Sequence, residues 1–253
     1  MQLKDKIIFL TGGSQGIGAE CARAYAREGA RLAIAALVKD EIDEVISELE
    51  GEHLALPCDV SDQFQVEKAI NDTRSFFGRI DAIHNNAGIA HPSKCLHDTT
   101  MDEWDRLMNV NVKSIYLTTR YGFEFLKSSK GCILNTSSMV GSIGQSLHAA
   151  YTATKGAINA LTKSMALDYA AYGIRVNAVA PAGVWTPMLR NWAKEQPNTA
   201  EIETYLDQIH PLGYCPTGDV IADACVFLLS EKARFITGTI LPVSGGAELG
   251  YKR

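Results

Sequence analysis

The feature that most constrains this chain is a regular alternation of short apolar runs with longer segments of helical periodicity. The first apolar run, Lys6–Thr11, is followed by a helical segment at Gly16–Gly29 and then by a second apolar run at Arg31–Val38. Strands without polar alternation are typically buried on both faces, and strands that alternate with helices imply right-handed crossovers between parallel strands. The sequence therefore predicts an α/β fold, a doubly wound parallel sheet of about seven strands flanked by helices.

The alternation continues along the whole chain, with one interruption. The expected strands are Lys6–Thr11, Arg31–Val38, His53–Cys58, Ile80–Asn85, Gly131–Ser137, Ile174–Ala180 and Thr239–Val243. The expected helices are Gly16–Gly29, Glu41–Glu50, Val66–Phe77, Asp102–Leu126, Ala150–Tyr172 and Asp219–Leu229. Since no linker rich in Pro, Ser or Gly divides the chain, we expect a single domain over residues 1–253. The segment 183–218 breaks the rhythm and holds two Trp and four Pro, which predicts a substrate loop or lid inserted in that domain.

Charge and hydropathy exclude two classes of partner. The formal net charge is −5 and no run of Lys and Arg offers a basic patch, so we expect no nucleic-acid partner. The longest unbroken apolar stretch is Leu32–Val38, whereas a membrane span needs roughly 18 residues, so we expect no membrane partner either. The N-terminus reaches its first glycines too early to hold a signal-peptide core, which favours a cytoplasmic location.

The six cysteines contain no CxxC pair, which agrees with a reducing compartment. The metal-like grouping in the sequence is His91, Cys95 and His97, in a polar stretch beside Pro92. A closed zinc site needs four ligands, and a second local pair is missing. We therefore interpret this stretch as a surface loop and expect no metal site.

A glycine-rich turn, Thr11–Gly18, lies between the first expected strand and the first expected helix. Glycines let the backbone approach a pyrophosphate, and the helix N-terminus offers free N–H groups and a partial positive charge. A tight strand-to-helix connection is the structural alternative, but the position in the first βα unit favours a dinucleotide site. It is not a Walker loop, because no Lys-Ser/Thr pair follows the glycines. The residues expected to bind the cofactor here are Gly12, Ser14, Gln15, Gly16, Ile17 and Gly18.

The end of the second expected strand should contact the adenosine ribose of the dinucleotide. An acidic residue there binds the 2′-hydroxyl of NAD, and an Arg binds the 2′-phosphate of NADP. The chain instead has Ala36, and Lys39 is the one basic residue nearby. The sequence therefore favours NAD, while NADP is not excluded.

A tyrosine and a lysine open the expected helix at 150–172. Tyr151 and Lys155 are four residues apart and share one helical face. A free phenol has a pKa of about 10, and a nearby cation favours the phenolate, so this pair can form a base. Ser138 ends the fifth expected strand, at the same carboxyl edge of the sheet where such folds bind ligands. The three positions together predict a catalytic site rather than an ordinary helix pair.

These residues carry a resemblance over nearly the whole chain. The motifs are TGGSQGIG (11–18), CDV (58–60), NNAG (85–88), NVNVKS (109–114), ILNTSS (133–138), YTATK (151–155), IRVNAVAP (174–181) and ITGTILPVSGG (236–246). The chain resembles the classical short-chain dehydrogenase/reductase family, a resemblance that implies a Rossmann fold. It departs from the family pattern at Ala36, at Pro181-Ala182-Gly183 and at Ser244. The second departure puts in doubt the placement of the loop over the nicotinamide.

The resemblance implies a role for each matching residue. Tyr151 is the acid and base, Ser138 polarises the substrate oxygen, and Lys155 lowers the tyrosine pKa and holds the nicotinamide ribose. Asn111 completes the tetrad and anchors a water in a proton relay. Other residues implied to bind the dinucleotide are Asp59 and Val60 at the adenine, Asn86, Ala87 and Gly88 at the adenosine, and Pro181, Val184 and Thr186 at the nicotinamide. The resemblance also implies a homotetramer, built on the long helices at 102–126 and 150–172.

Three shorter stretches narrow the resemblance within the family. SSMVGSIGQ (137–145), VWTP (184–187) and SGGAELGY (244–251) are similar to the group that holds the 17-beta-hydroxysteroid dehydrogenases of type 14 and the L-fucose dehydrogenases. This implies oxidation of a secondary alcohol, at C1 of L-fucose or a related aldose. The polar residues expected near such a substrate are His91, Gln145, His148 and Trp185, beside Ser138 and Tyr151. Each of the first four has a structural alternative as a loop, capping or surface residue.

Other functions stay open at this point. Within the family these are a 17-beta-hydroxysteroid dehydrogenase and a 3-oxoacyl or other carbonyl reductase. A methyltransferase also has a glycine-rich turn, but its cofactor needs an acidic residue after the second strand, where this chain has none. A non-catalytic NAD-binding regulatory protein is the remaining alternative, and it has no need of a complete tetrad.

Overall fold

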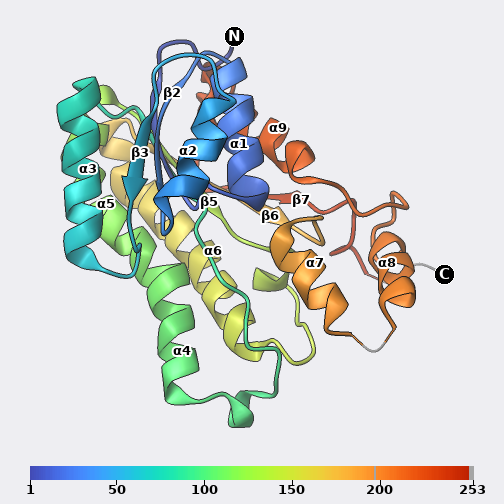
Figure 1. The fold of residues 1–253 in the computed structure, drawn as a ribbon. Helices are drawn as coiled ribbons and strands as arrows, with labels where there is room; N and C mark the ends of the chain where they lie inside the picture. The colour runs from blue at the N-terminus through green and yellow to red at the C-terminus, as the bar shows by residue number, and fades with distance from the viewer. Residues whose placement is uncertain (197, 251–253) are drawn as a thin grey trace.

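The computed structural model describes residues 1–196 and 198–250 (Figure 1). Tyr251, the last residue of the SGGAELGY motif, lies outside the described residues. The described part contains one parallel sheet in the order β3-β2-β1-β4-β5-β6-β7, which confirms the predicted doubly wound topology. Its strands are β1 Ile7–Thr11, β2 Arg31–Ala36, β3 Leu54–Pro57, β4 Ala82–Asn85, β5 Cys132–Thr136, β6 Arg175–Pro181 and β7 Ile240–Val243.

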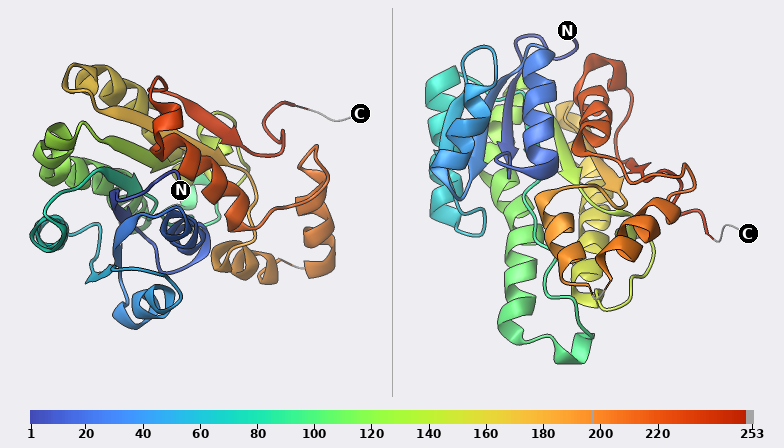
Figure 2. Two further views of the ribbon diagram at one scale, coloured as in Figure 1. Left: turned by 90° about the horizontal axis from the view of Figure 1, so that it is seen from above. Right: turned by 45° about the vertical axis from the view of Figure 1, so that its right-hand side comes forward.

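Helices cover both faces of the sheet (Figure 2). On one face lie α1 (Gly16–Arg27), α2 (Lys39–Ser47) and α9 (Gly218–Leu229). On the other face lie α3 (Gln63–Phe77), α5 (Ser114–Ser129) and α6 (Ala149–Tyr169). In β1, Ile8 and Leu10 belong to the first core and Phe9 to the second, and all three are fully buried. The two cores explain why the strands are apolar at successive positions.

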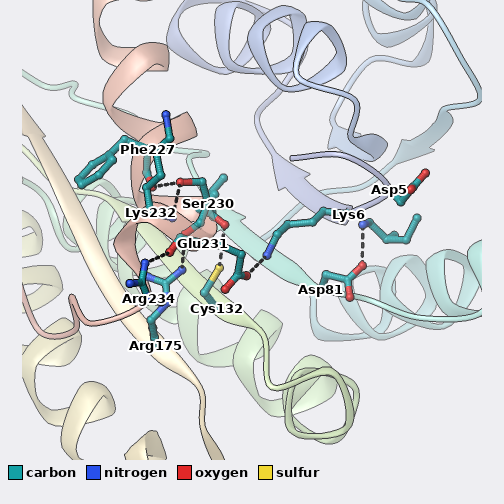
Figure 3. Close-up of polar contacts among 12 residues, drawn as sticks. Asp5, Lys6, Asp81, Cys132, Arg175, Phe227, Ser230, Glu231, Lys232 and Arg234 are labelled. Carbon is teal, nitrogen blue, oxygen red and sulfur yellow. Dashed lines mark hydrogen bonds and ion pairs between the residues drawn. The ribbon is translucent and has the colours of Figure 1, made fainter. Parts of the chain in front are cut away.

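The amino-terminal edge of the sheet is closed by polar contacts (Figure 3). The Lys6 ammonium bonds the Glu231 carboxylate at 2.9 Å, and the backbone N–H of Ile7 donates to Asp81 at 2.8 Å. The guanidinium of Arg175, at the start of β6, donates to the carbonyl of Ser230 after α9. The opposite, carboxyl edge of the sheet is therefore the edge left for a ligand, as parallel sheets of this type require.

The single helix predicted over 102–126 is wrong in one respect. The structure has α4 at Met101–Met108, a π-helical turn at Asn109–Lys113, and then α5. The turn inserts one residue into the helical ladder and holds the buried Asn111, whose bonds are described below. Inserted turns of this kind are frequent at functional sites.

The segment 183–218, predicted from its composition as a substrate loop or lid, has secondary structure of its own. It contains two helices, α7 at Pro187–Lys194 and α8 at Thr199–Gln208. The Thr186 hydroxyl caps α7 by accepting from the backbone N–H of Leu189, and Pro187 occupies the first turn, where no N–H is needed.

In the described part of the chain, no helix is both long and apolar enough to cross a bilayer.

Candidate active site

The glycine-rich turn between β1 and α1 forms a cradle for a phosphate. Gly12 and Gly16 adopt φ values of +64° and +57°, which favour glycine. A Cβ added to Gly18 would lie 2.0 Å from the carbonyl oxygen of Gly12, so no side chain fits there. Gln15, the N-cap of α1, makes no side-chain bond to the helix, so the first N–H groups of α1 have no capping side chain. These features fit the pyrophosphate of a dinucleotide.

The loop after β4 holds this turn in place. The Asn86 amide donates to the carbonyls of Thr11 at 3.2 Å and Gly12 at 3.0 Å. In return, the Thr11 hydroxyl accepts the backbone N–H groups of Asn86 and Ala87. Thr186 contacts the turn from the far side, since a Cβ added to Gly16 would lie 3.3 Å from its side chain. Residues predicted from three separate motifs thus meet around one turn.

The end of β2 carries no cation for a 2′-phosphate. Ala36 is buried there, and Lys39 forms an ion pair with Asp43 in the next helical turn. The Ser14 hydroxyl of the glycine turn donates to the carboxylate of Glu41 at 3.0 Å. The surroundings of this position are therefore acidic.

Two predicted adenine contacts lie next in the chain. The carboxylate of Asp59 accepts the backbone N–H and the hydroxyl of Ser61 at 2.9 and 2.7 Å, so it braces the loop after β3. Val60 is buried beside it. Both follow β3, the strand that neighbours β2 in the sheet.

Three residues of the predicted tetrad meet at the carboxyl edge of β5 and the start of α6. The Lys155 ammonium donates to the Thr136 carbonyl at 2.8 Å and lies over the Tyr151 ring, 5.5 Å from its centroid. The Ser138 hydroxyl donates to the Pro181 carbonyl at 3.4 Å, and its interaction with the Tyr151 phenol lowers the pKa of that phenol. This geometry brings Ser138, Tyr151 and Lys155 together, at the edge that also holds the glycine turn.

Burial determines the pKa shifts of Tyr151 and Lys155. It raises the pKa of Tyr151 to about 12, against the lowering effect of the Ser138 bond, and it lowers the pKa of Lys155 to about 8. The sequence had led us to expect a phenol acidified by its neighbouring ammonium. In the structure desolvation dominates, because Lys155 is only 5% exposed and its Nζ lies over the face of the ring. At pH 7 the lysine is charged and the phenol is neutral.

Asn111, the fourth predicted residue, lies in the π-helical turn and is buried. Its amide donates to the carbonyl of Ile89 at 2.8 Å and to the Thr154 hydroxyl at 3.1 Å, and its carbonyl accepts the Ile89 N–H at 2.8 Å. The side chain thus ties the loop after β4 to α6. A Cβ added to Gly88 would lie 3.4 Å from Asn111 Oδ1 and 3.7 Å from Lys155 Nζ, so Gly88 lies between both residues.

Of the four extra residues predicted to contact substrate, His148 is the one that packs on Tyr151. Its ring is edge-on to the Tyr151 ring, with centroids 6.4 Å apart. Its two nitrogens bond the Ser93 hydroxyl at 2.9 Å and the Ser146 carbonyl at 3.0 Å. Ser93 was not predicted from the sequence, because it lies 55 residues away in the chain.

The other three candidates are less enclosed. His91 and Gln145 are exposed, and Trp185 is half-buried with the Arg190 guanidinium 5.1 Å from its ring centroid. Val184, beside it, is buried. The metal-like stretch is exposed: Cys95 and His97 lie near Asp98, and His91 is not part of the group.

Comparison with known proteins agrees with this geometry. A family model described as enoyl-(acyl carrier protein) reductase matches residues 12–248. The chain is similar to an L-fucose dehydrogenase of Bos taurus, with 42% identity over 98% of this chain and 91% of the relative. The fold is similar to the crystal structure of a levodione reductase, with a TM-score of 0.94 and 31% identity over 98% of this chain and 100% of that one. It is also similar to a 3-ketoacyl-(acyl-carrier-protein) reductase from Brucella melitensis complexed with NADH, with a TM-score of 0.90 and 32% identity over 97% and 99%.

The fold, the site and these relatives define one class: the protein is an oxidoreductase, and its cofactor is a nicotinamide dinucleotide. Each named relative is a dehydrogenase or a reductase, and each is matched over at least 97% of this chain. The chain belongs to the short-chain dehydrogenase/reductase family. The resemblance inferred from the sequence motifs is therefore confirmed.

Proposed function

We propose that the protein oxidises the anomeric C1 hydroxyl of L-fucose or a related aldose to the lactone, with NAD as the hydride acceptor. The observation that carries this proposal is the 42% identity to an L-fucose dehydrogenase over 98% of the chain. The polar pair of His148 and Ser93 beside Tyr151 supports a hydroxyl-rich substrate, because buried polar groups favour ligands that can hydrogen-bond.

The surroundings of Ala36 support NAD over NADP. A 2′-phosphate needs a cation, and Lys39 is already paired with Asp43. Glu41, which accepts from Ser14 at the glycine turn, would repel a further phosphate.

The residues of the site can perform this reaction as follows. The Ser138 hydroxyl and the Tyr151 oxygen hold the C1 hydroxyl, and Tyr151, once it has lost its own proton to solvent, takes the proton of that hydroxyl. The C1 hydride leaves at the same time, and the nicotinamide ring supplies the acceptor for it when bound. The charge of Lys155 favours the phenolate form of Tyr151. The Thr136 carbonyl accepts from the Lys155 ammonium and so holds this charge over the Tyr151 ring. The products are the lactone, the reduced dinucleotide and one proton.

A substrate panel tests the proposal. L-fucose, D-arabinose, L-galactose, L-rhamnose and estradiol are each supplied with NAD and with NADP, and the rate is followed by nicotinamide absorbance. We expect kcat/KM for L-fucose with NAD to exceed kcat/KM for estradiol with NAD by at least about tenfold. We expect the same margin over L-fucose with NADP. One polar or charged contact left unpaired lowers binding by about this factor. Turnover of estradiol alone would instead support a steroid dehydrogenase. The likeness to a levodione reductase makes reduction of a cyclic diketone with NADH the second candidate, and turnover of that ketone without sugar oxidation would overturn the sugar proposal.

The segment 183–218 is proposed to cover the substrate. The chain contacts the site where this segment begins. Ser138 donates to the Pro181 carbonyl just before the segment, and Thr186 within it lies against the glycine turn. Helices α7 and α8 then extend from this contact beyond the carboxyl edge of the sheet (Figure 1).

We also propose a homotetramer, as the family resemblance implies. Exposed apolar side chains on the long helices support it, since Tyr116 on α5 is 56% exposed and Leu167 on α6 is 81% exposed. Gel filtration should give about four times the 27.5 kDa mass of the chain. Elution at the mass of one chain would contradict this proposal.

A further inference from the structure

A buried histidine lies behind the cofactor site and has no part in the mechanism described so far. His84 is in β4, 0% exposed, between α1 and β5. One ring nitrogen, Nδ1, lies 2.9 Å from the Tyr25 hydroxyl, and the other, Nε2, lies 3.0 Å from the Thr136 hydroxyl. A buried imidazole needs hydrogen bonds at both nitrogens, and a fully satisfied buried network of this kind holds its side chains in fixed positions.

The hydrogen bond between Thr136 and Asn86 decides the direction of the other bonds in this series. The Thr136 hydroxyl donates to Asn86 Oδ1 at 3.3 Å, so it must accept from His84 Nε2–H. In the neutral imidazole, Nδ1 then carries no proton and accepts the Tyr25 O–H.

The chain of bonds ends on the phosphate cradle. Once its Oδ1 accepts from Thr136, the Asn86 amide nitrogen faces the other way, where it bonds the carbonyls of Thr11 and Gly12. The glycine turn closes around this amide, since a Cβ added to Gly18 would lie 2.5 Å from Asn86 Nδ2. A flipped Asn86 amide would set its oxygen against two carbonyl oxygens and push the turn apart.

The same histidine also has two sulfurs nearby. Cys21, His84 and Cys225 place their ligand atoms within 4.8 Å of one another, all buried. Both nitrogens of His84 already have hydrogen-bond partners, so the geometry favours a hydrogen-bonded chain over a metal site.

We propose that His84 is a positioning residue for dinucleotide binding. By donating to Thr136 it fixes the Asn86 amide, and the amide holds the glycine turn in the shape that receives the pyrophosphate. The proposal requires a dinucleotide cofactor but not a particular substrate, so it stands whether or not the sugar panel succeeds.

The test measures the Kd for NADH by titration calorimetry, together with the Tm of the protein without cofactor. His84→Leu removes both bonds at similar volume and is expected to raise Kd about tenfold. Because Ser138 and Tyr151 are outside the chain of bonds, kcat at saturating dinucleotide should change by less than about threefold. His84→Gln, whose amide can still donate to Thr136, is expected to recover much of the affinity.

Variants at Thr136 keep the test decisive if His84→Leu does not fold. Thr136→Val removes the hydroxyl that links His84 to Asn86 and should raise Kd about as much, whereas Thr136→Ser keeps the hydroxyl and should not. The double variant of His84→Leu and Thr136→Val should be no worse than either single change, since both break one chain.

The matched control is Thr73→Val. Thr73 is fully buried, and in the described residues its hydroxyl donates to the Ala69 carbonyl within α3, away from the turn. It should lower Tm and leave the Kd for NADH unchanged. If Thr136→Val and His84→Leu, where it folds, likewise lower Tm but keep Kd within twofold of the wild-type value, His84 is only a core residue and the proposal is overturned.

Discussion

Replacing Tyr151 by Phe should lower kcat by about 10³-fold, because the phenol is the one acid–base group that both Ser138 and Lys155 contact. The Kd for NADH should stay within about twofold, since a phenylalanine keeps the ring under the Lys155 ammonium and leaves the glycine turn untouched. Steady-state rates by nicotinamide absorbance and calorimetric binding measure the two quantities separately. The prediction holds for any alcohol that the enzyme oxidises.

The control for this change is Tyr172→Phe. Tyr172 is 42% exposed beyond the far end of α6, and its recorded contacts, with Phe123 and Lys127, are made by the ring. Loss of its hydroxyl should leave both kcat and Kd as they are. A Tyr151→Phe enzyme that kept a tenth or more of the wild-type kcat would show that another group moves the proton.

The fold could be predicted from the sequence because the evidence for it is local. Each apolar run, such as Lys6–Thr11, is long enough to be recognised and is bounded by a turn, and parallel crossovers have one hand. All seven strands were expected within a few residues of their observed bounds. The same holds for the Tyr151 and Lys155 pair, whose spacing places them on one face of a helix.

The features that the sequence could not supply depend on distant contacts. The π-helical turn holds Asn111, which bonds Ile89, 22 residues away, and no periodicity records such a bond. The two asparagines in the middle of an otherwise amphipathic helix, at 109 and 111, were the available signal.

The pKa values of Tyr151 and Lys155 are also hidden from an argument based on residue spacing. Residue spacing showed that the ammonium and the phenol are neighbours, but the sign of each pKa shift follows from burial, which depends on the surrounding elements. The chain from Tyr25 through His84 to Asn86 was missed for a related reason, because its bonds join residues 50 or more positions apart.

The buried ammonium of Lys155 leads to the second large effect. Lys155→Met should lower kcat by at least about 100-fold, because the charge that favours the Tyr151 phenolate is removed. At pH 7 the same change should make the cofactor-free protein more stable, by about 1–2 kcal/mol. Burial of the charged amine costs up to about 3 kcal/mol when the pKa falls from 10.5 to about 8, and the lost bond to the Thr136 carbonyl returns part of this. Urea unfolding of the cofactor-free protein measures the difference.

The pH dependence of that stability distinguishes a buried charge from a packing effect. Between pH 8 and pH 10.5 the unfolded lysine is protonated and the folded one is not, so wild-type stability should rise with pH across this window. Lys155→Met lacks the titration, and its advantage should shrink as pH rises through the window and be lost by its upper end. Lys163→Met, an exposed lysine two turns further along α6, should show neither the gain nor the pH dependence. An advantage of Lys155→Met that is equal at pH 7 and pH 10 would mean that the methionine merely packs better. A gain that fades with pH would instead show that the enzyme gives up stability to keep a cation over the Tyr151 ring.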